Sequence, residues 1–117
     1  MGLSTHVLDT MHGTPAAGMA VALYATDDDS ATLLKQLVLN QDGRNPGGLL
    51  LEGDALRRGC YRLVFDVAGY YAARGVDLPQ PNFLGKVQVD FGIAEPGQHY
   101  HVPLLVSPWS YSTYRGS

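Results

Sequence analysis

Four side chains that could do acid–base chemistry or hold a planar ring stand on the polar sides of predicted β-strands: His6, His99, His101 and Tyr114. Alternate residues of a strand face opposite ways. The apolar residues of 100–106 therefore face a core, and both His99 and His101 face outward. The same parity turns His6 and Tyr114 outward from their own strands. A neutral imidazole, with a pKa near ~6.5, is available as a base at neutral pH.

Parity alone leaves two interpretations open for this outer face: a functional site, or a solvated face with incidental histidines. Three imidazoles would also suit an open catalytic zinc site, with His6 joining the His99-x-His101 pair. Against zinc, no acidic or cysteine ligand stands near these histidines in the sequence. Two other candidates favour structural roles. Asp9 and His12 are typical of a turn, and Cys60 is more typical of a small buried residue than of a nucleophile.

The elements that must position the outward face are short. Periodicity and turn residues predict strands over 3–9, 19–24, 33–40, 49–51, 60–67, 84–93, 100–106 and 110–115. Helix propensity competes over 33–40, but the NQDGR turn after it favours a strand. One short helix is expected over 68–74, with Asp66 near its start and Gly75 as its stop. The prediction is an all-β, two-sheet sandwich of about eight strands with one short helix.

Bulk properties limit the possible partners. The chain has 117 residues, which fits a single domain over 1–117, with 45% hydrophobic and 16% charged residues. The low charge indicates that neighbouring subunits cover part of the surface. A net charge of −3 without a basic cluster argues against nucleic acid. No apolar run reaches the ~20 residues of a membrane span, and no secretory signal is visible. The acidic run 27–30 is typical of a solvated loop.

Segments from both ends and the middle of the chain resemble one family. LSTHVLD (3–9) matches the opening of the 5-hydroxyisourate hydrolases of the transthyretin-like family. HYHVPLL (99–105) and the terminal YRGS (114–117) match its end, and YRGS is the family's mark. NQDGR (40–44) and GCYRL (59–63) fit its middle. The segment 45–48 departs somewhat from the usual pattern, which puts the shape of that loop in doubt.

The resemblance implies a transthyretin-like sandwich of two four-stranded sheets with a short helix. It implies a homotetramer, a dimer of dimers, whose subunits would cover the polar sheet face. The implied substrate is 5-hydroxyisourate, and the product is 2-oxo-4-hydroxy-4-carboxy-5-ureidoimidazoline. No metal or organic cofactor is expected. A bacterial cytoplasmic location is expected.

The resemblance also assigns roles to residues. The family's catalytic positions fall on His6, Arg44, His101 and Ser117, and substrate contacts fall on His6, Arg44 and Tyr114. His99, Arg115 and Gly116 are expected to lie behind them and support them. Gly116 would also let the end of the chain turn sharply beyond the sheet. The closest rival is a small-ligand carrier like transthyretin, because fold does not fix function; carriers lack this set of residues.

The implied reaction needs water to attack the C6 carbonyl and break the C6–N1 bond. One of His6 and His101 would take the water proton, and the other would position the reactants or donate a proton. Arg44 would stabilise the oxyanion with its forked donors. Tyr114 would bind the ring, and Ser117 would close the pocket or hold water.

Overall fold

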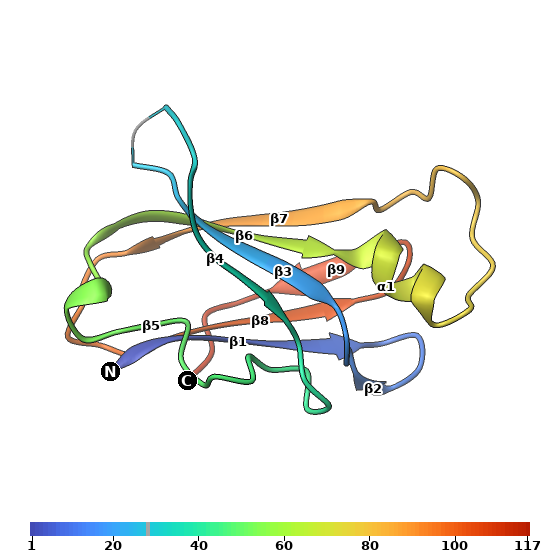
Figure 1. The fold of residues 1–117 in the computed structure, drawn as a ribbon, viewed down its shortest axis with the longest axis horizontal. Helices are drawn as coiled ribbons and strands as arrows, with labels where there is room; N and C mark the ends of the chain where they lie inside the picture. Colours follow the sequence, from blue (N-terminus) through green and yellow to red (C-terminus); the bar gives the residue numbers. More distant parts are fainter. Residues whose placement is uncertain (28) are drawn as a thin grey trace.

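The computed structural model describes residues 1–27 and 29–117 as two stacked β-sheets (Figure 1). One sheet has the order β2-β1-β8-β9, with β5 also paired to β1, and the other has the order β4-β3-β6-β7. The first sheet's strands are β1 (Gly2–Asp9), β2 (Thr14–Pro15), β5 (Leu51–Glu52), β8 (Tyr100–Val106) and β9 (Tyr111–Thr113). The second sheet's are β3 (Ala20–Ala25), β4 (Thr32–Val38), β6 (Gly59–Asp66) and β7 (Lys86–Ile93). Along the chain, a 3-10 turn (Gly53–Ala55) follows β5, and helix α1 (Val67–Ala73) follows β6.

The predicted sandwich with one short helix is confirmed. The described strands number nine rather than about eight, because residues 14–15 pair with the end of β1 after the turn at Gly13. The strand favoured over 33–40 is present as β4 over Thr32–Val38, because β3 pairs with it. Within the expected 27–30 loop, Asp28 lies outside the described residues. No helix in the described part of the chain is long and apolar enough to cross a membrane.

Alternation along the strands builds the core as predicted. On β1 the inward residues are Leu3, Thr5 and Val7, and on β8 they are Tyr100, Val102, Leu104 and Val106; all are buried. The same parity corrects one expectation. Cys60 is exposed rather than buried, because β6 turns its alternate residues Tyr61, Leu63 and Phe65 inward.

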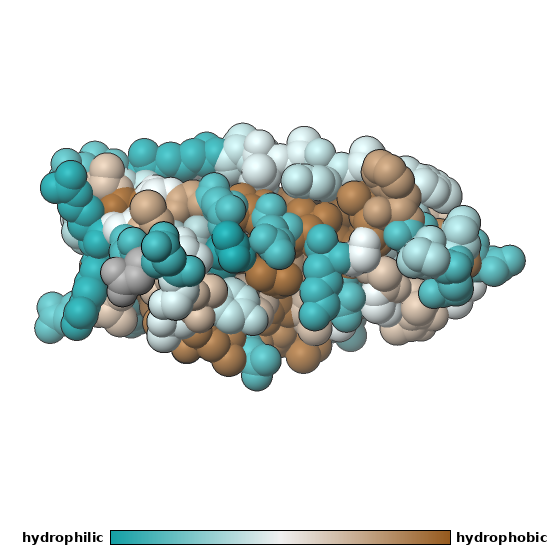
Figure 2. All heavy atoms as spheres, turned by 90° about the horizontal axis from the view of Figure 1, so that it is seen from above, coloured by the Kyte–Doolittle hydropathy of each residue, from teal (hydrophilic) through white to brown (hydrophobic). Residues whose placement is uncertain are grey.

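Apolar side chains also remain on the surface, and Figure 2 shows several such areas among polar ones when the molecule is seen from above. The large exposed hydrophobic residues include Leu33, Leu34, Val38, Phe83, Trp109, Tyr111 and Tyr114. In the described chain, β7 and β9 each pair with only one strand and form edges of their sheets. Apolar groups beside open strand edges favour association with other chains.

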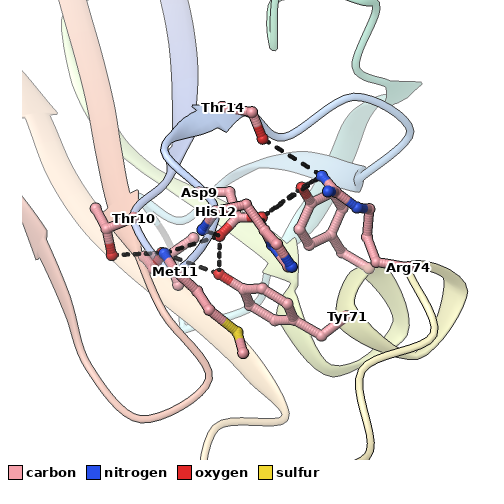
Figure 3. A network of polar contacts seen from close by, with 9 residues as sticks. Asp9, Thr10, Met11, His12, Thr14, Tyr71 and Arg74 are labelled. Atoms are coloured by element: carbon pink, nitrogen blue, oxygen red, sulfur yellow. Dashed lines mark hydrogen bonds and ion pairs between the residues drawn. The ribbon is translucent and has the colours of Figure 1, made fainter.

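A buried carboxylate ties the end of β1 to α1 (Figure 3). Asp9 has no exposed surface, and its oxygens accept hydrogen bonds from the hydroxyls of Tyr71 (2.7 Å) and Tyr70 (2.8 Å). The His12 ring lies 2.6 Å away, and the main-chain N–H groups of Met11 and His12 also donate to Asp9. The turn expected from Asp9 and His12 is therefore present, but the carboxylate also anchors the helix.

Burial alone would raise the pKa of Asp9, but hydrogen bonds from Tyr71, His12 and Tyr70 outweigh burial and lower it. The ionised form is thus the one that the fold stabilises. This contribution is present above the unfolded-state pKa of about 3.9 and is lost as pH falls through the lower folded-state value.

Replacing this carboxylate should weaken the whole domain. We expect Asp9→Asn to lower the free energy of unfolding by about 2–4 kcal/mol, because the amide leaves buried donors without acceptors. Urea unfolding at pH 7 measures this. The control is Asp90→Asn, which removes a largely exposed partner of Arg62 and should cost at most about 1 kcal/mol. Equal losses in the two variants would contradict the anchoring role of Asp9.

Candidate active site

Parallel pairing of β1 with β8 brings polar side chains of the two strands together. In the register of the two strands, Ser4 lies opposite His101 and His6 lies opposite Pro103. Paired residues of neighbouring strands share a face, so His6 and His101 lie on the same outward face. Both side chains are half-buried. The structure therefore brings together the two histidines that the sequence proposed for catalysis.

Ser4 lies within this cluster, although it was not a predicted site residue. Its Oγ is 2.8 Å from Nδ1 of His101 and 3.1 Å from Nε2 of His99. Ser4 thereby joins His99 to His101, and the supporting role expected of His99 stays a prediction. The signal that could have found Ser4 is its parity, because it stands two residues before His6 on the same strand.

A tight turn delivers Arg44 to the same face. The Asn40 side chain accepts hydrogen bonds from the N–H groups of Asp42 (2.9 Å) and Arg44 (3.1 Å). Gly43 adopts φ = 71° and packs on β1, where an added Cβ would stand 2.6 Å from the carbonyl oxygen of Val7. Only glycine fits so close an approach with this backbone. Arg44 follows in an isolated antiparallel bridge to His6.

Arg44 gives the site its electrostatic character. Burial is the largest cause that lowers the pKa of His6, and the Arg44 cation adds to it, against an opposing contribution from Asp42. Burial also lowers the pKa of His101 below its ordinary value, with further lowering from Arg44, His6 and His99. Both imidazoles are therefore neutral at pH 7 and able to accept a proton beside a fixed positive charge.

The tail returns to the sheet instead of turning away. Gly116 forms an antiparallel bridge with His101, and its N–H donates to the His101 carbonyl oxygen at 2.8 Å. The expected course of the tail beyond the sheet is wrong, because Gly116 pairs with His101. Glycine is needed there for closeness, because an added Cβ would stand 2.6 Å from Cδ2 of the His101 ring.

Arg115 fastens this tail. Its guanidinium lies 4.0 Å above the ring centroid of Tyr100 and donates to the side chain of Gln98 and the carbonyl oxygen of His99. Cation–π contact and two hydrogen bonds hold the chain beside the histidines. The supporting role in catalysis expected of Arg115 stays a prediction.

Among the contacts of the described residues, none joins Tyr114 or Ser117 to the histidine cluster. Tyr114 lies one residue beyond β9, is 60% exposed, and lines a cavity of 240 Å³ with residues of β7, β8 and β9. Ser117 follows Gly116 and is exposed. As for the zinc alternative, no three His, Cys, Asp or Glu side chains among residues 1–27 and 29–117 are grouped to hold a metal ion.

Comparison with known proteins agrees with this arrangement. The sequence model of the HIUase/Transthyretin family matches residues 3–116. This chain belongs to the HIUase/Transthyretin family. A 5-hydroxyisourate hydrolase from Ralstonia nicotianae is 54% identical over 98% of this chain and 97% of its own. One from Pseudomonas aeruginosa is 50% identical over 98% of this chain and 90% of its own.

Solved structures share the family fold. The 5-hydroxyisourate hydrolase of Klebsiella pneumoniae is 35% identical over the full length of both chains, with a TM-score of 0.80. An (S)-allantoin synthase is 44% identical with a TM-score of 0.94, but the match covers 99% of this chain and 43% of that one. Sea bream transthyretin in complex with thyroxine is 28% identical, with a TM-score of 0.86 over 99% of this chain and 95% of its own. The similar structures thus include proteins named as enzymes and a transthyretin bound to thyroxine.

Removing the cation should change the titration of both histidines. We expect Arg44→Gln to raise the pKa of His6 and His101, because Arg44 lowers both. Histidine titration followed by NMR measures the shifts. Arg44→Lys should keep both values low by retaining the charge. Arg62→Gln, on the other sheet, is the matched control and should leave them unchanged. Unchanged titration in Arg44→Gln would show that its charge does not act on the site.

Proposed function

We propose that this chain hydrolyses 5-hydroxyisourate to 2-oxo-4-hydroxy-4-carboxy-5-ureidoimidazoline. The observation that carries the proposal is the meeting of His6, His101 and Arg44 on one outward face, with both imidazoles kept neutral. Relatives that are 54% and 50% identical over nearly the whole chain carry the name 5-hydroxyisourate hydrolase. That activity is the hydrolysis of a purine-derived substrate and belongs to urate degradation.

The arrangement suits general-base hydrolysis. A neutral histidine takes a proton from water, and the hydroxide oxygen bonds to C6 of the substrate. The oxyanion that forms there is stabilised by the guanidinium of Arg44, a contribution worth about 3–4 kcal/mol per donor in other enzymes. Breaking of the C6–N1 bond returns the proton to N1. The reaction needs no metal or organic cofactor.

Transthyretin-like transport is the second candidate, since sea bream transthyretin was solved with thyroxine. That relative is 28% identical, against 54% for a named hydrolase. A carrier would not require two neutral imidazoles beside a fixed cation. The same cluster supports catalysis and gives no specific support to transport.

The working form is a homotetramer, a dimer of dimers, with 5-hydroxyisourate bound where subunits meet. Support comes from family membership, from the open edges of β7 and β9, and from exposed Trp109, Tyr111 and Tyr114 near one of those edges. A covering subunit would remove bulk water from the histidine face and strengthen its charge interactions. Close bacterial relatives favour the bacterial cytoplasm as the location.

One assay tests the function directly. 5-Hydroxyisourate is generated from urate and urate oxidase, and its decay is followed by absorbance with and without the protein. We expect acceleration that a chelator leaves unchanged. His6→Ala, Arg44→Ala and His101→Ala should each lower kcat about 100-fold or more, because each removes an acid–base or oxyanion group.

Arg62→Ala is the matched control and should keep the native rate, because it removes an arginine from the second sheet. Circular dichroism and sedimentation of every sample check folding and the tetramer. No acceleration by the folded native protein would refute the enzyme, and loss of rate with chelator that zinc restores would favour the metal alternative. A fully active monomer would refute the subunit-interface site.

The close approach of the tail makes a second variant informative. Gly116→Ala should lower kcat about tenfold or more, because the new methyl group displaces the His101 ring while the core is untouched. The unfolding midpoint should change little. Gly85→Ala is the control, since its added Cβ meets no atom within 4 Å. Native turnover in Gly116→Ala would show that the tail does not act through His101.

A further inference from the structure

We propose that Ser4 is a positioning residue, whose single hydroxyl proton couples His99 to His101 and keeps Nε2 of His101 free to accept a proton. The proposal rests on the hydrolytic function proposed above, and it also selects His101 as the base. It starts from the position of the Ser4 hydroxyl between two histidine rings. One Oγ atom lies within hydrogen-bond distance of two different imidazole nitrogens, at 2.8 Å and 3.1 Å.

Hydrogen-bond counting leaves two states in which the Ser4 proton itself joins the two rings. A serine hydroxyl has one proton to donate and lone pairs to accept with. In these states each imidazole carries one proton, and Ser4 donates to one ring nitrogen and accepts from an N–H of the other. In the first state it donates to Nδ1 of His101, so the His101 proton sits on Nε2. In the second it accepts from Nδ1–H of His101 and donates to Nε2 of His99. In a third state Ser4 would accept from an N–H of both rings, and its own proton would not join them.

Of the two states in which the Ser4 proton joins the rings, only the second makes His101 a base at Nε2. With the proton on Nδ1, the lone pair of His101 is on Nε2, which hydrogen-bonds to none of residues 1–27 and 29–117. When Nε2 takes a proton from water, the ring becomes an imidazolium that must donate at both nitrogens. Ser4 already accepts from Nδ1–H and already donates to His99. The second state thus needs no reorganisation during proton transfer.

His99 completes this series of hydrogen bonds, because its Nε2 accepts the hydrogen bond from the Ser4 hydroxyl. Its own proton is then on Nδ1, and its main-chain carbonyl is held by Arg115 at 3.0 Å. A third group that orients a base through hydrogen bonds is a recurring device in enzymes, and such partners commonly affect activity 10–100-fold. Ser4 and His99 together would take this part for His101.

The neighbouring hydroxyl shows what a purely structural bond looks like on the same strand. Thr5 is buried, faces the core, and donates to the carbonyl oxygen of Val102 at 2.7 Å. The Ser4 hydroxyl instead hydrogen-bonds to two side chains, those of His99 and His101. The adjacent positions therefore form a matched pair for experiment, one supporting the fold and one supporting the imidazoles.

Several groups determine the pH at which His101 titrates. His6 on β1, Arg44 in the loop after β4, and His99 just before β8 surround His101. All three lower the pKa of His101 in addition to burial. From the tail, Gly116 pairs with His101, and the neighbouring Arg115 donates to the carbonyl oxygen of His99. Loss of the Ser4 hydroxyl removes an acceptor for the imidazolium, so the acid limb of kcat should move to lower pH.

The test compares Ser4→Ala, Ser4→Thr and Thr5→Val with the native protein. We expect Ser4→Ala to lower kcat roughly 10–100-fold with KM changed less than about threefold. Ser4→Thr should restore most of kcat, because it returns a hydroxyl. Thr5→Val should lower the unfolding midpoint but keep the native pH profile. NMR of ¹⁵N-labelled histidines should show the Nδ1–H form of His101 in the native protein and a mixture in Ser4→Ala.

The two proposals fail in different ways. A folded native protein that does not accelerate 5-hydroxyisourate decay refutes the hydrolytic function, and the NMR measurement then still decides whether Ser4 couples the imidazoles. A native protein that is active while Ser4→Ala has the same kcat and pH profile overturns the positioning role. An Nε2–H form of His101 in the active native protein overturns it as well.

Discussion

The parallel ladder between β1 and β8 is the constraint on which the rest of the molecule depends. Its register runs from Leu3 opposite Tyr100 to Asp9 opposite Val106. A slip of one residue would turn His6 into the core and Val7 outward, so the buried face enforces the register that the site requires. Parallel neighbours also need a long crossover, and here nearly the whole chain lies between the two strands.

Asp9 closes one end of that ladder. Tyr71 donates both to Asp9 and to the carbonyl oxygen of Val106, and the N–H of Thr10 donates to the same carbonyl. The last pair of the ladder is thus held by α1 from outside the sheet. Half-buried polar groups lie around Ser4 on the outward face of the ladder. The buried inward residues of β1 and β8 hold the two strands in place there.

The site combines one permanent cation with imidazoles that burial keeps neutral. Arg44 reaches it because Gly43 lets the turn rest directly on β1, and the tail reaches it because Gly116 fits against the His101 ring. Two glycines therefore bring main chain from two distant segments against the same pair of strands.

The sequence by itself predicted the sandwich and the inward and outward faces of β1 and β8, because period-two alternation and local turn motifs are short-range signals. Parity put His6, His99 and His101 on outward faces, and only the family resemblance added Arg44 to them. Cys60, Ser4 and Asp9 show where it fell short. Alternation on β6 placed Cys60 outward, against the composition-based expectation of burial. Only tertiary structure could join Ser4 to two histidines almost a hundred residues away, or Asp9 to the tyrosines of α1. Hydrogen bonds between distant segments depend on strand order and register, which a single sequence does not encode locally.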